Sequence, residues 1–319
     1  HNIGRNVAIA GGCPVTVPGT TINRFCSSGL QSIAVAAQRI IVDGIKVAIG
    51  GGVESISMTQ QNMNMKHLIE PELQKVCPAL WMPMINTADV VADRYKVSRE
   101  YQDEYSLQSQ QRTAAAQTEG KFKDEIIAVN VKSRRGDTIV EEDEYPKHGT
   151  NLETLGSLRP AFSKEGTVTA GNASGINDGA AAVVLMSSED ARRRGIEPLA
   201  RIKSFATRGV DPSIMGTGPI PASRAALEKA GWTVDDLDLI EANEAFAAQA
   251  CAVNKDMGWD TQKVNVNGGS IALGHPIGAS GARVLITLLH EMKKRDAKKG
   301  LTTLCIGGGM GVAMCLERD

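Results

Sequence analysis

Apolar residues recur at helical spacing in the segment that follows Cys26, and polar residues fill the positions between them. This pattern predicts an amphipathic helix with one buried face. Its apolar stripe consists of Leu30, Ile33, Ala34, Ala37 and Ile41. Gly44 is placed to end the helix, and residues 45–49 predict a short buried strand that runs into three glycines at 50–52.

The same plan recurs near the C-terminus. A glycine-rich stretch at residues 273–281 leads into a second helical stripe, and residues 301–305 predict a buried strand after it. That stripe consists of Val284, Leu285, Leu288 and Leu289. Because both segments end in Ile-Gly-Gly-Gly, at 49–52 and 306–309, we expect two copies of one α/β unit. The functional site is then expected where the strand and helix ends of the copies meet.

A polar, irregular region lies between the two copies and predicts an inserted loop domain, with an amphipathic helix near residues 99–119. Further strands are expected at 179–187, 199–208 and 237–241, and a helix from about Glu244. This alternation predicts an α/β fold built on a doubly wound sheet. We therefore divide the chain into a first half (1–56 and 169–198), a loop domain (57–168) and a second half (199–319).

Composition narrows the class of protein. The chain has 319 residues, of which 42% are hydrophobic, as in a globular protein. Lys and Arg number 35 against 36 Asp and Glu, so no strong positive field is present to bind nucleic acid. The purely apolar runs are shorter than the roughly 20 residues of a membrane span. These features argue against a nucleic-acid partner and a membrane protein.

The six cysteines form no Cys-x-x-Cys pair, which argues against a disulfide scaffold or a zinc site and favours a reducing compartment, the cytoplasm in a bacterium. The sequence begins at His1 without an initiator Met. We therefore expect an N-terminal piece to precede it, and targeting to an organelle stays open.

Four residues are candidates for chemistry. Cys26 precedes a helix, where the unpaired N–H groups and the dipole favour a thiolate. His275 lies between two glycine turns, Cys305 ends a buried strand, and Asn243 follows a strand where a helix is expected to start. Taken singly, each also has a structural interpretation: a packed cysteine, a core histidine or a helix N-cap.

Together these residues lie in blocks that resemble the thiolase family, the acetyl-CoA C-acyltransferases. The blocks are Asn-Arg-Phe-Cys-Ser-Ser-Gly at 23–29, Thr-Ala-Gly-Asn-Ala-Ser-Gly at 169–175, Asn-Glu-Ala-Phe at 243–246, Gly-His-Pro-Ile-Gly-Ala-Ser-Gly at 274–281 and Cys-Ile-Gly-Gly-Gly-Met-Gly at 305–311. They occur in the family's order and span most of the chain. The resemblance implies an acyltransferase with a five-layered αβαβα fold of two similar halves and an inserted loop domain.

The resemblance also implies a role for each candidate. Cys26 is acylated by a thioester, which divides a difficult reaction into two steps. His275, with a pKa near neutrality, takes the proton of Cys26. Cys305 exchanges a proton with the α-carbon of the substrate. Backbone N–H groups of Cys26 and Gly307 form one oxyanion hole, and His275 forms the other with a water held by Asn243.

Coenzyme A thioesters are substrates in this family, and the resemblance implies no further cofactor and no metal. The residues that match its acyl and pantetheine contacts are Met84, Phe162, Ala170, Ser174, Met215, Ala245 and Phe246. Lys147 matches a basic residue that meets the nucleotide phosphates, which carry several negative charges. The family also implies a homo-oligomer, either a dimer or a tetramer.

The sequence departs from the family pattern in three places. About sixty residues of the family pattern are lacking before His1. The loop between Gly52 and Met84 is roughly ten residues shorter than in acetoacetyl-type members, and Pro83 stands where those members have His. The latter two favour a degradative 3-oxoacyl-CoA thiolase that accepts several chain lengths. The alternatives are a biosynthetic acetoacetyl-CoA thiolase, a decarboxylating condensing enzyme, against which Cys305 argues, and a non-catalytic acyl-CoA or lipid carrier.

Overall fold

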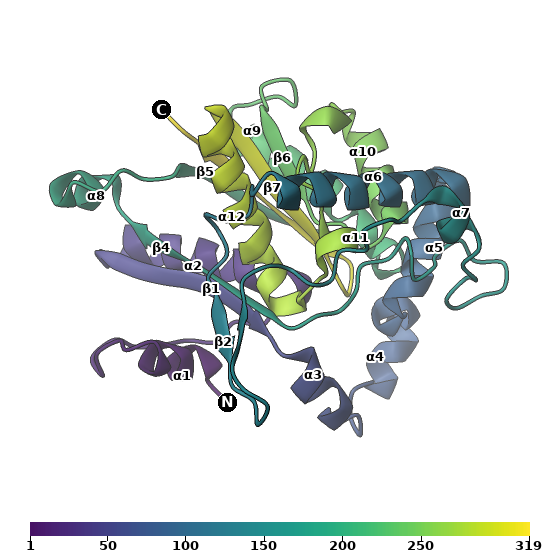
Figure 1. Cartoon of the computed structure of the whole chain (residues 1–319), viewed down its shortest axis with the longest axis horizontal. Coiled ribbons are helices and arrows are strands. Elements are labelled where there is room, and N and C mark those ends of the chain that lie inside the picture. The colour runs from purple at the N-terminus through teal and green to yellow at the C-terminus, as the bar shows by residue number, and fades with distance from the viewer.

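Two sheets of unequal size form the framework of the computed structural model, which describes residues 1–319 (Figure 1). The smaller sheet pairs β1 (Val47–Glu54) antiparallel with β4 (Gly179–Met186). The larger sheet has the order β5-β8-β7-β6. Its strands are β5 (Arg201–Gly209), β6 (Leu239–Ala242), β7 (Lys299–Ile306) and β8 (Met310–Glu317). Only β6 and β7 are parallel in this sheet.

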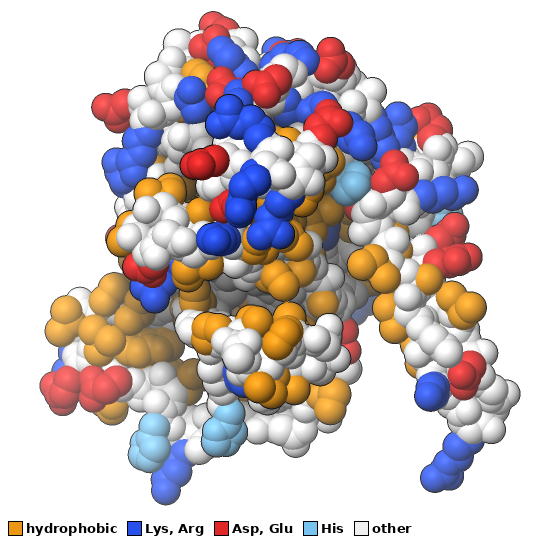
Figure 2. Space-filling view, turned by 90° about the vertical axis from the view of Figure 1, so that its left-hand side faces the viewer, with side chains coloured by type: hydrophobic (Ala, Val, Ile, Leu, Met, Phe, Trp, Pro, Cys, Tyr) orange, Lys and Arg blue, Asp and Glu red, His pale blue; other side chains and the backbone are white.

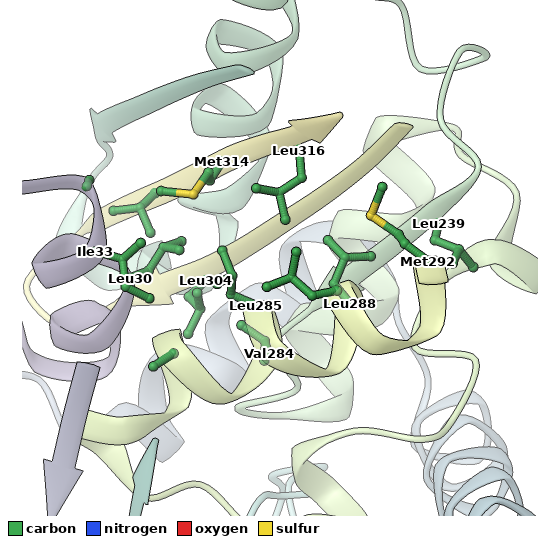
Figure 3. Packing of buried hydrophobic residues seen from close by; sticks show 14 of the residues in the cluster. Leu30, Ile33, Leu239, Val284, Leu285, Leu288, Met292, Leu304, Met314 and Leu316 are labelled. Carbon is green, nitrogen blue, oxygen red and sulfur yellow. The ribbon is translucent and has the colours of Figure 1, made fainter. Parts of the chain in front are cut away.

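Two helices pack between these sheets and join the halves. Helix α2 (Ser28–Asp43) contacts β1, and α12 (Ile277–Arg295) contacts α2 and strands of both sheets. Figure 3 shows the resulting core, in which side chains of α2, α12, β7 and β8 converge. The labelled members are Leu30, Ile33, Leu239, Val284, Leu285, Leu288, Met292, Leu304, Met314 and Leu316. The stripe predicted for α12 is fully buried here, and so are Leu30, Ile33 and Ala34 of the stripe predicted for α2. The prediction was wrong for the end of the α2 stripe, because Ile41 is 81% exposed.

The other face of the larger sheet is covered by α9 (Pro219–Ala230) and, beyond it, by α10 (Ala247–Met257). The region between β1 and β4 supplies most of the remaining elements. They are α3 (Ile56–Thr59), α4 (Pro71–Val76), α5 (Met84–Tyr95), α6 (Arg99–Thr118), β2 (Val129–Val131), β3 (Thr138–Val140) and α7 (Leu152–Gly156). Outside this region lie α1 (Ile3–Ala10), α8 (Ser188–Arg194) and α11 (Ser270–Leu273).

The first glycine triplet differs from its prediction. Residues 45–49 were expected to form a buried strand ending at the glycines, but β1 runs from Val47 to Glu54 and contains all three. Ile49 is 61% exposed, whereas Gly50 is buried. A Cβ atom at Gly50 would lie 2.8 Å from the Cα atom of Ile33 on α2. Glycines therefore form the part of the strand on which the helix packs, because a side chain would not fit.

The two halves also differ in the number of strands. The smaller sheet has two, and the strands that flank β7 and β8 in the larger sheet have no counterpart beside β1 and β4. Hydrophobic side chains are exposed on this side of the molecule, among them Ile49 and Val184, and the view from this side shows hydrophobic patches at the surface (Figure 2). The helix expected from about Glu244 begins later, at Ala247.

One helical stretch, Phe25–Asp43, is long and apolar enough to meet the criteria for a membrane span. Core helices pass the same test, and α2 packs against α12 and β1. The finding therefore carries little weight.

The closest approach between α2 and α12 depends on glycine. A Cβ atom on Gly29 would lie 2.5 Å from the backbone nitrogen of Ala282, and one on Gly281 would meet the backbone nitrogen of Leu30. The contact lies three residues after Cys26, so it sets where the start of α2 sits relative to α12. Any side chain here separates the helices or shifts the turn that holds Cys26.

We predict that Gly29→Ala lowers the free energy of unfolding by about 2 kcal/mol, the usual size of an overpacking defect. Chemical denaturation of the two proteins measures the difference. Gly156→Ala is the matched control, because nothing lies within 4 Å of a Cβ atom at that position; it should leave stability unchanged or raise it slightly. Equal stabilities for Gly29→Ala and the wild type would show that the helices separate without cost.

Candidate active site

Cys26 lies in a short 3-10 helix, Phe25–Ser27, that turns the chain into α2. Phe25, directly before it, has a positive φ of 46°, an uncommon conformation for an aromatic residue. This 3-10 helix packs against β7, and the backbone N–H of Gly307, directly after β7, faces Cys26 closely enough to lower the pKa of its thiol. Cys26 therefore sits where the start of α2, from the first half, meets the end of β7, from the second.

The sequence predicted a lowered pKa for Cys26, and this prediction was wrong. Burial raises the pKa to about 11, and the hydrogen bond from Gly307 and the N–H of Cys26 itself offset only part of this effect. The nearby carboxylate of Glu54 raises it further. Desolvation outweighs the helix terminus because the charged thiolate loses more water than two backbone donors replace. Cys26 is thus a neutral thiol at rest.

Cys305 is the second thiol of the site. It lies on β7 opposite Gly311 of β8 and has no exposed surface. Its pKa is raised, first by burial and next by the charge of Cys26. The 3-10 helix that carries Cys26 packs against β7, the strand of Cys305. The structure therefore brings together one cysteine from each half.

His275 is held through its backbone and one ring nitrogen. The backbone N–H of His275 donates to the carbonyl of Gly175 at 2.7 Å, and the ring atom Nδ1 lies 2.6 Å from Ser280 Oγ. Ser280 Oγ also donates to the carbonyl of Pro276 at 3.0 Å. Because the Ser280 hydroxyl donates its proton to the Pro276 carbonyl, it can only accept a hydrogen bond from His275, so Nδ1 carries the ring proton. This leaves Nε2 unprotonated, as a free base. Nε2 is buried and has no hydrogen-bond partner.

The prediction of a near-neutral pKa for His275 was wrong. Burial lowers it to about 4, and the positive charge of Arg283 contributes. The imidazole is therefore neutral at physiological pH. A neutral imidazole can accept a proton from a thiol, whereas an imidazolium could not.

Asn243 directly follows β6, where its N–H donates to the carbonyl of Thr303 on β7 at 3.0 Å. It is not the helix N-cap, because Phe246 holds that position in α10. The side chain is 1% exposed. Its Oδ1 accepts from Ser270 Oγ at 2.6 Å, and its Nδ2 has no partner. Asn243 Nδ2, like His275 Nε2, is thus a buried polar atom without a partner.

Gly307 opens the turn between β7 and β8, and two side chains from the inserted region border this turn. A Cβ atom on Gly307 would lie 3.4 Å from Met84 Sδ, and one on Gly308 would lie 3.6 Å from Leu80 Cδ1. Met84 was expected near the acyl group. Leu80 was missed, because a single leucine in an irregular segment carries no signal in the sequence.

The candidate coenzyme A contacts divide into two groups. Met215, Ala245 and Phe246 are buried in one cluster with Cys305, and Met84 packs against it. Ser174 joins them through its N–H and Oγ, which donate to the carbonyl of Ala245 at 3.0 and 2.9 Å.

The second group, Lys147, Phe162 and Ala170, is exposed. Lys147 Nζ lies 5.4 Å from the centre of the Tyr145 ring. A long, charged ligand that runs from solvent to a buried thiol needs an exposed end of this kind, but none of the three residues contacts the cysteines or His275.

Comparison with known proteins identifies the family. Residues 1–189 match the family model of the thiolase N-terminal domain, and residues 196–318 match that of the thiolase C-terminal domain. This chain belongs to the thiolase family. It is therefore an enzyme, an acyltransferase, and its two α/β halves are those of the thiolase fold.

Curated relatives and solved structures agree with this assignment. Acetyl-CoA acetyltransferases from Paracoccus denitrificans and Rhizobium meliloti (strain 1021) are 56% and 55% identical to the chain, over all of it and 84% of their own length. The structures of human mitochondrial 3-ketoacyl-CoA thiolase and Bacillus anthracis acetyl-CoA acetyltransferase both superpose on this thiolase with a TM-score of 0.91, at 42% and 45% sequence identity. Each superposition covers 99% of this chain and 83% of the other chain.

The buried imidazole predicts how stability depends on pH. An unfolded histidine binds a proton below about pH 6.5, whereas folded His275 does so only near pH 4. Between these values the unfolded state binds more protons, so stability falls as the pH falls. We predict that His275→Asn removes about 3 kcal/mol of this loss between pH 6.5 and 4, as measured by urea unfolding.

The matched control is His148→Asn, which replaces an exposed histidine and should keep the wild-type pH dependence. If His275→Asn also keeps it, burial does not hold the imidazole in its neutral form.

Proposed function

We propose that this thiolase catalyses acyl-CoA + acetyl-CoA ⇌ CoA + 3-oxoacyl-CoA in two half-reactions, through an acyl group on Cys26. The observation that carries the proposal is the packing of the 3-10 helix of Cys26 against β7, the strand that carries Cys305 and leads into Gly307. One thiol forms and releases a thioester, and the other exchanges the proton that makes or quenches the enolate. Coenzyme A thioesters are the substrates, and no metal or other cofactor takes part.

The first half-reaction of thiolysis starts with proton transfer from Cys26 to His275 Nε2. The thiolate attacks the 3-oxo carbonyl, whose oxygen becomes negative and accepts hydrogen bonds from the N–H groups of Cys26 and Gly307. The carbonyl re-forms as the C2–C3 bond breaks and leaves the enolate of acetyl-CoA. Cys305 gives its proton to C2 and becomes a thiolate. Its raised pKa suits this step, because the resting group still holds the proton.

The second half-reaction returns the enzyme to its starting state. The thiol of free CoA gives its proton to the Cys305 thiolate, and the CoA thiolate attacks acyl-Cys26. Cys26 leaves as a thiolate and takes back the proton held by His275. Each proton is thus returned, and the reverse sequence describes condensation. The residues do not set the direction, which depends on substrate concentrations.

For the acyl chain, we propose that several lengths are accepted, as in a degradative 3-oxoacyl-CoA thiolase. The support is Met84, which lies against Gly307 and whose flexible side chain can move to admit a longer chain. Pro83, at the N-cap of α5, begins the helix that carries it. The second candidate is a short-chain acetoacetyl-CoA thiolase, which the name shared by the curated relatives favours. A homo-oligomer, dimer or tetramer, and a cytoplasmic location stay predictions.

We predict that Cys26→Ser abolishes the acyl adduct, because a serine hydroxyl cannot be deprotonated by a neutral imidazole as readily as a thiol. With acetyl-CoA as the acyl donor, Cys305→Ser should keep the adduct on Cys26 and slow the subsequent condensation by about 10³-fold or more. Intact-mass analysis and rapid quenching measure these effects. Cys77→Ser, a change outside the site, should behave as the wild type. Normal turnover by Cys26→Ser would contradict the assignment, and loss of the adduct in Cys305→Ser would contradict the role given to Cys305.

We predict adducts on Cys26 from both acetoacetyl-CoA and a medium-chain 3-oxoacyl-CoA. Met84→Phe, which replaces a flexible side chain by a rigid ring at the same wall, should lower kcat/KM for the medium-chain substrate by about tenfold more than for acetoacetyl-CoA. Adducts from acetoacetyl-CoA alone would establish the short-chain candidate. Binding of acyl-CoA without any adduct would favour the carrier, and turnover of a malonyl thioester would favour the decarboxylating enzyme.

A further inference from the structure

Ser270 is a buried hydroxyl to which no role has been given above. It begins α11, between β6 and α12, and has no exposed surface. Two residues flank its Oγ atom: Arg283 Nη2 donates to it at 3.0 Å, and the hydroxyl donates to Asn243 Oδ1 at 2.6 Å. The three side chains therefore form a line from α12 to the end of β6, which ends beside the site.

The direction of these hydrogen bonds follows from the chemistry of the groups. A guanidinium only donates, so Arg283 occupies a lone pair of Ser270 Oγ and leaves the hydroxyl proton free for another partner. A buried proton needs an acceptor, and Asn243 Oδ1 is the one within reach. If the amide turned by 180°, Nδ2 would face the hydroxyl and the proton of Ser270 would have no acceptor. The donors of Arg283 thus determine, through Ser270, which way the amide points.

The fixed amide directs a donor away from Ser270. With Oδ1 held, Nδ2 points to the opposite side, where it is buried and without a partner. A preorganised donor in a dry environment stabilises an oxygen that becomes negative, either directly or through a bound water. A flipped amide would present an oxygen there, which would repel the same charge.

Arg283 is itself held on the strand that carries Asn243. Its Nη1 lies 3.7 Å from the carboxyl of Glu241, two residues before Asn243, and the Arg283 side chain is mostly buried. Its charge also reaches His275. The same guanidinium therefore influences both Asn243 and His275.

We propose that Ser270 is a positioning residue that holds the Asn243 amide with Nδ2 toward the enolate oxygen of acetyl-CoA. This inference rests on the proposed function, because it requires Asn243 to act in the carbon–carbon step. Ser270 does not touch the substrate, and it has no part in the acylation of Cys26, whose oxyanion is bound by backbone N–H groups.

The test compares the two half-reactions in Ser270→Ala, which removes one buried atom. Rapid quenching with acetyl-CoA measures acylation, and the subsequent condensation measures the carbon–carbon step. We expect condensation to slow by about tenfold while acylation and the KM for acetyl-CoA change by less than twofold. Ser270→Thr, which retains a hydroxyl, should recover part of the loss. Ser223→Ala is the matched control, because Ser223 is also fully buried, lies on α9 and has no partner for its Oγ atom.

A double-mutant cycle with Asn243→Ala distinguishes positioning from a general structural effect. If Ser270 acts through the amide, Ser270→Ala should add nothing to the loss caused by Asn243→Ala. Additive losses, or equal slowing of both half-reactions, would overturn the inference. Slow condensation in Asn243→Ala with a normal rate in Ser270→Ala would overturn the inference about Ser270 and leave the proposed function in place. A normal rate in Asn243→Ala would overturn both the inference and the role of Asn243 in the proposed function.

Discussion

The buried carboxylate of Glu244 connects the parts of the molecule that form the site. One oxygen accepts from Tyr105 Oη and Asn265 Nδ2, each at 3.0 Å, and the other from Ser109 Oγ at 2.7 Å and the N–H of Ile271 at 3.2 Å. These donors come from α6, from the segment after α10 and from α11. A carboxylate without water is tolerated only when donors replace it. The inserted region and the end of β6, where Asn243 and Glu244 lie, must therefore assemble together. Neither can move without leaving the buried carboxylate of Glu244 unpaired.

Burial then determines the chemistry of the resting enzyme. It raises the pKa of Cys26 to about 11 and lowers that of His275 to about 4, so both groups are neutral. Transfer of the proton between them is unfavourable by on the order of 10 kcal/mol before the attraction of the resulting ions is counted. A thiol that stays neutral until a thioester is present is protected from unproductive reactions, and Asn243 Nδ2 keeps a buried donor without a partner.

The sequence predicted the parts of the fold that depend on apolar side chains. The stripe of α12 was correct, and that of α2 was correct up to Ala34, because these parts bury a continuous hydrophobic face, whereas Ile41 at the end of the α2 stripe is exposed. The first strand was misplaced because its packing face is made of Gly50 and Gly52, and periodicity rules look for side chains that are absent here. The pKa directions of Cys26 and His275 could not be predicted either, because they depend on how much protein surrounds each group in three dimensions. Ser270 carried no signal, since its role depends only on its neighbours in the fold.

The two glycine triplets show how one duplicated unit comes to perform two tasks. In the first half the triplet stays within β1, where Gly52 lies against the carbonyl of Gly278 at the start of α12. In the second half β7 ends one residue before the triplet, so its glycines form a turn and Gly307 is free to donate to Cys26. Glycine is required in both places, for close helix packing in one and for an accessible N–H in the other. The first half therefore supplies the nucleophile and the close contact that fixes it, while the second supplies the donor and the other thiol, so neither half alone contains a complete site.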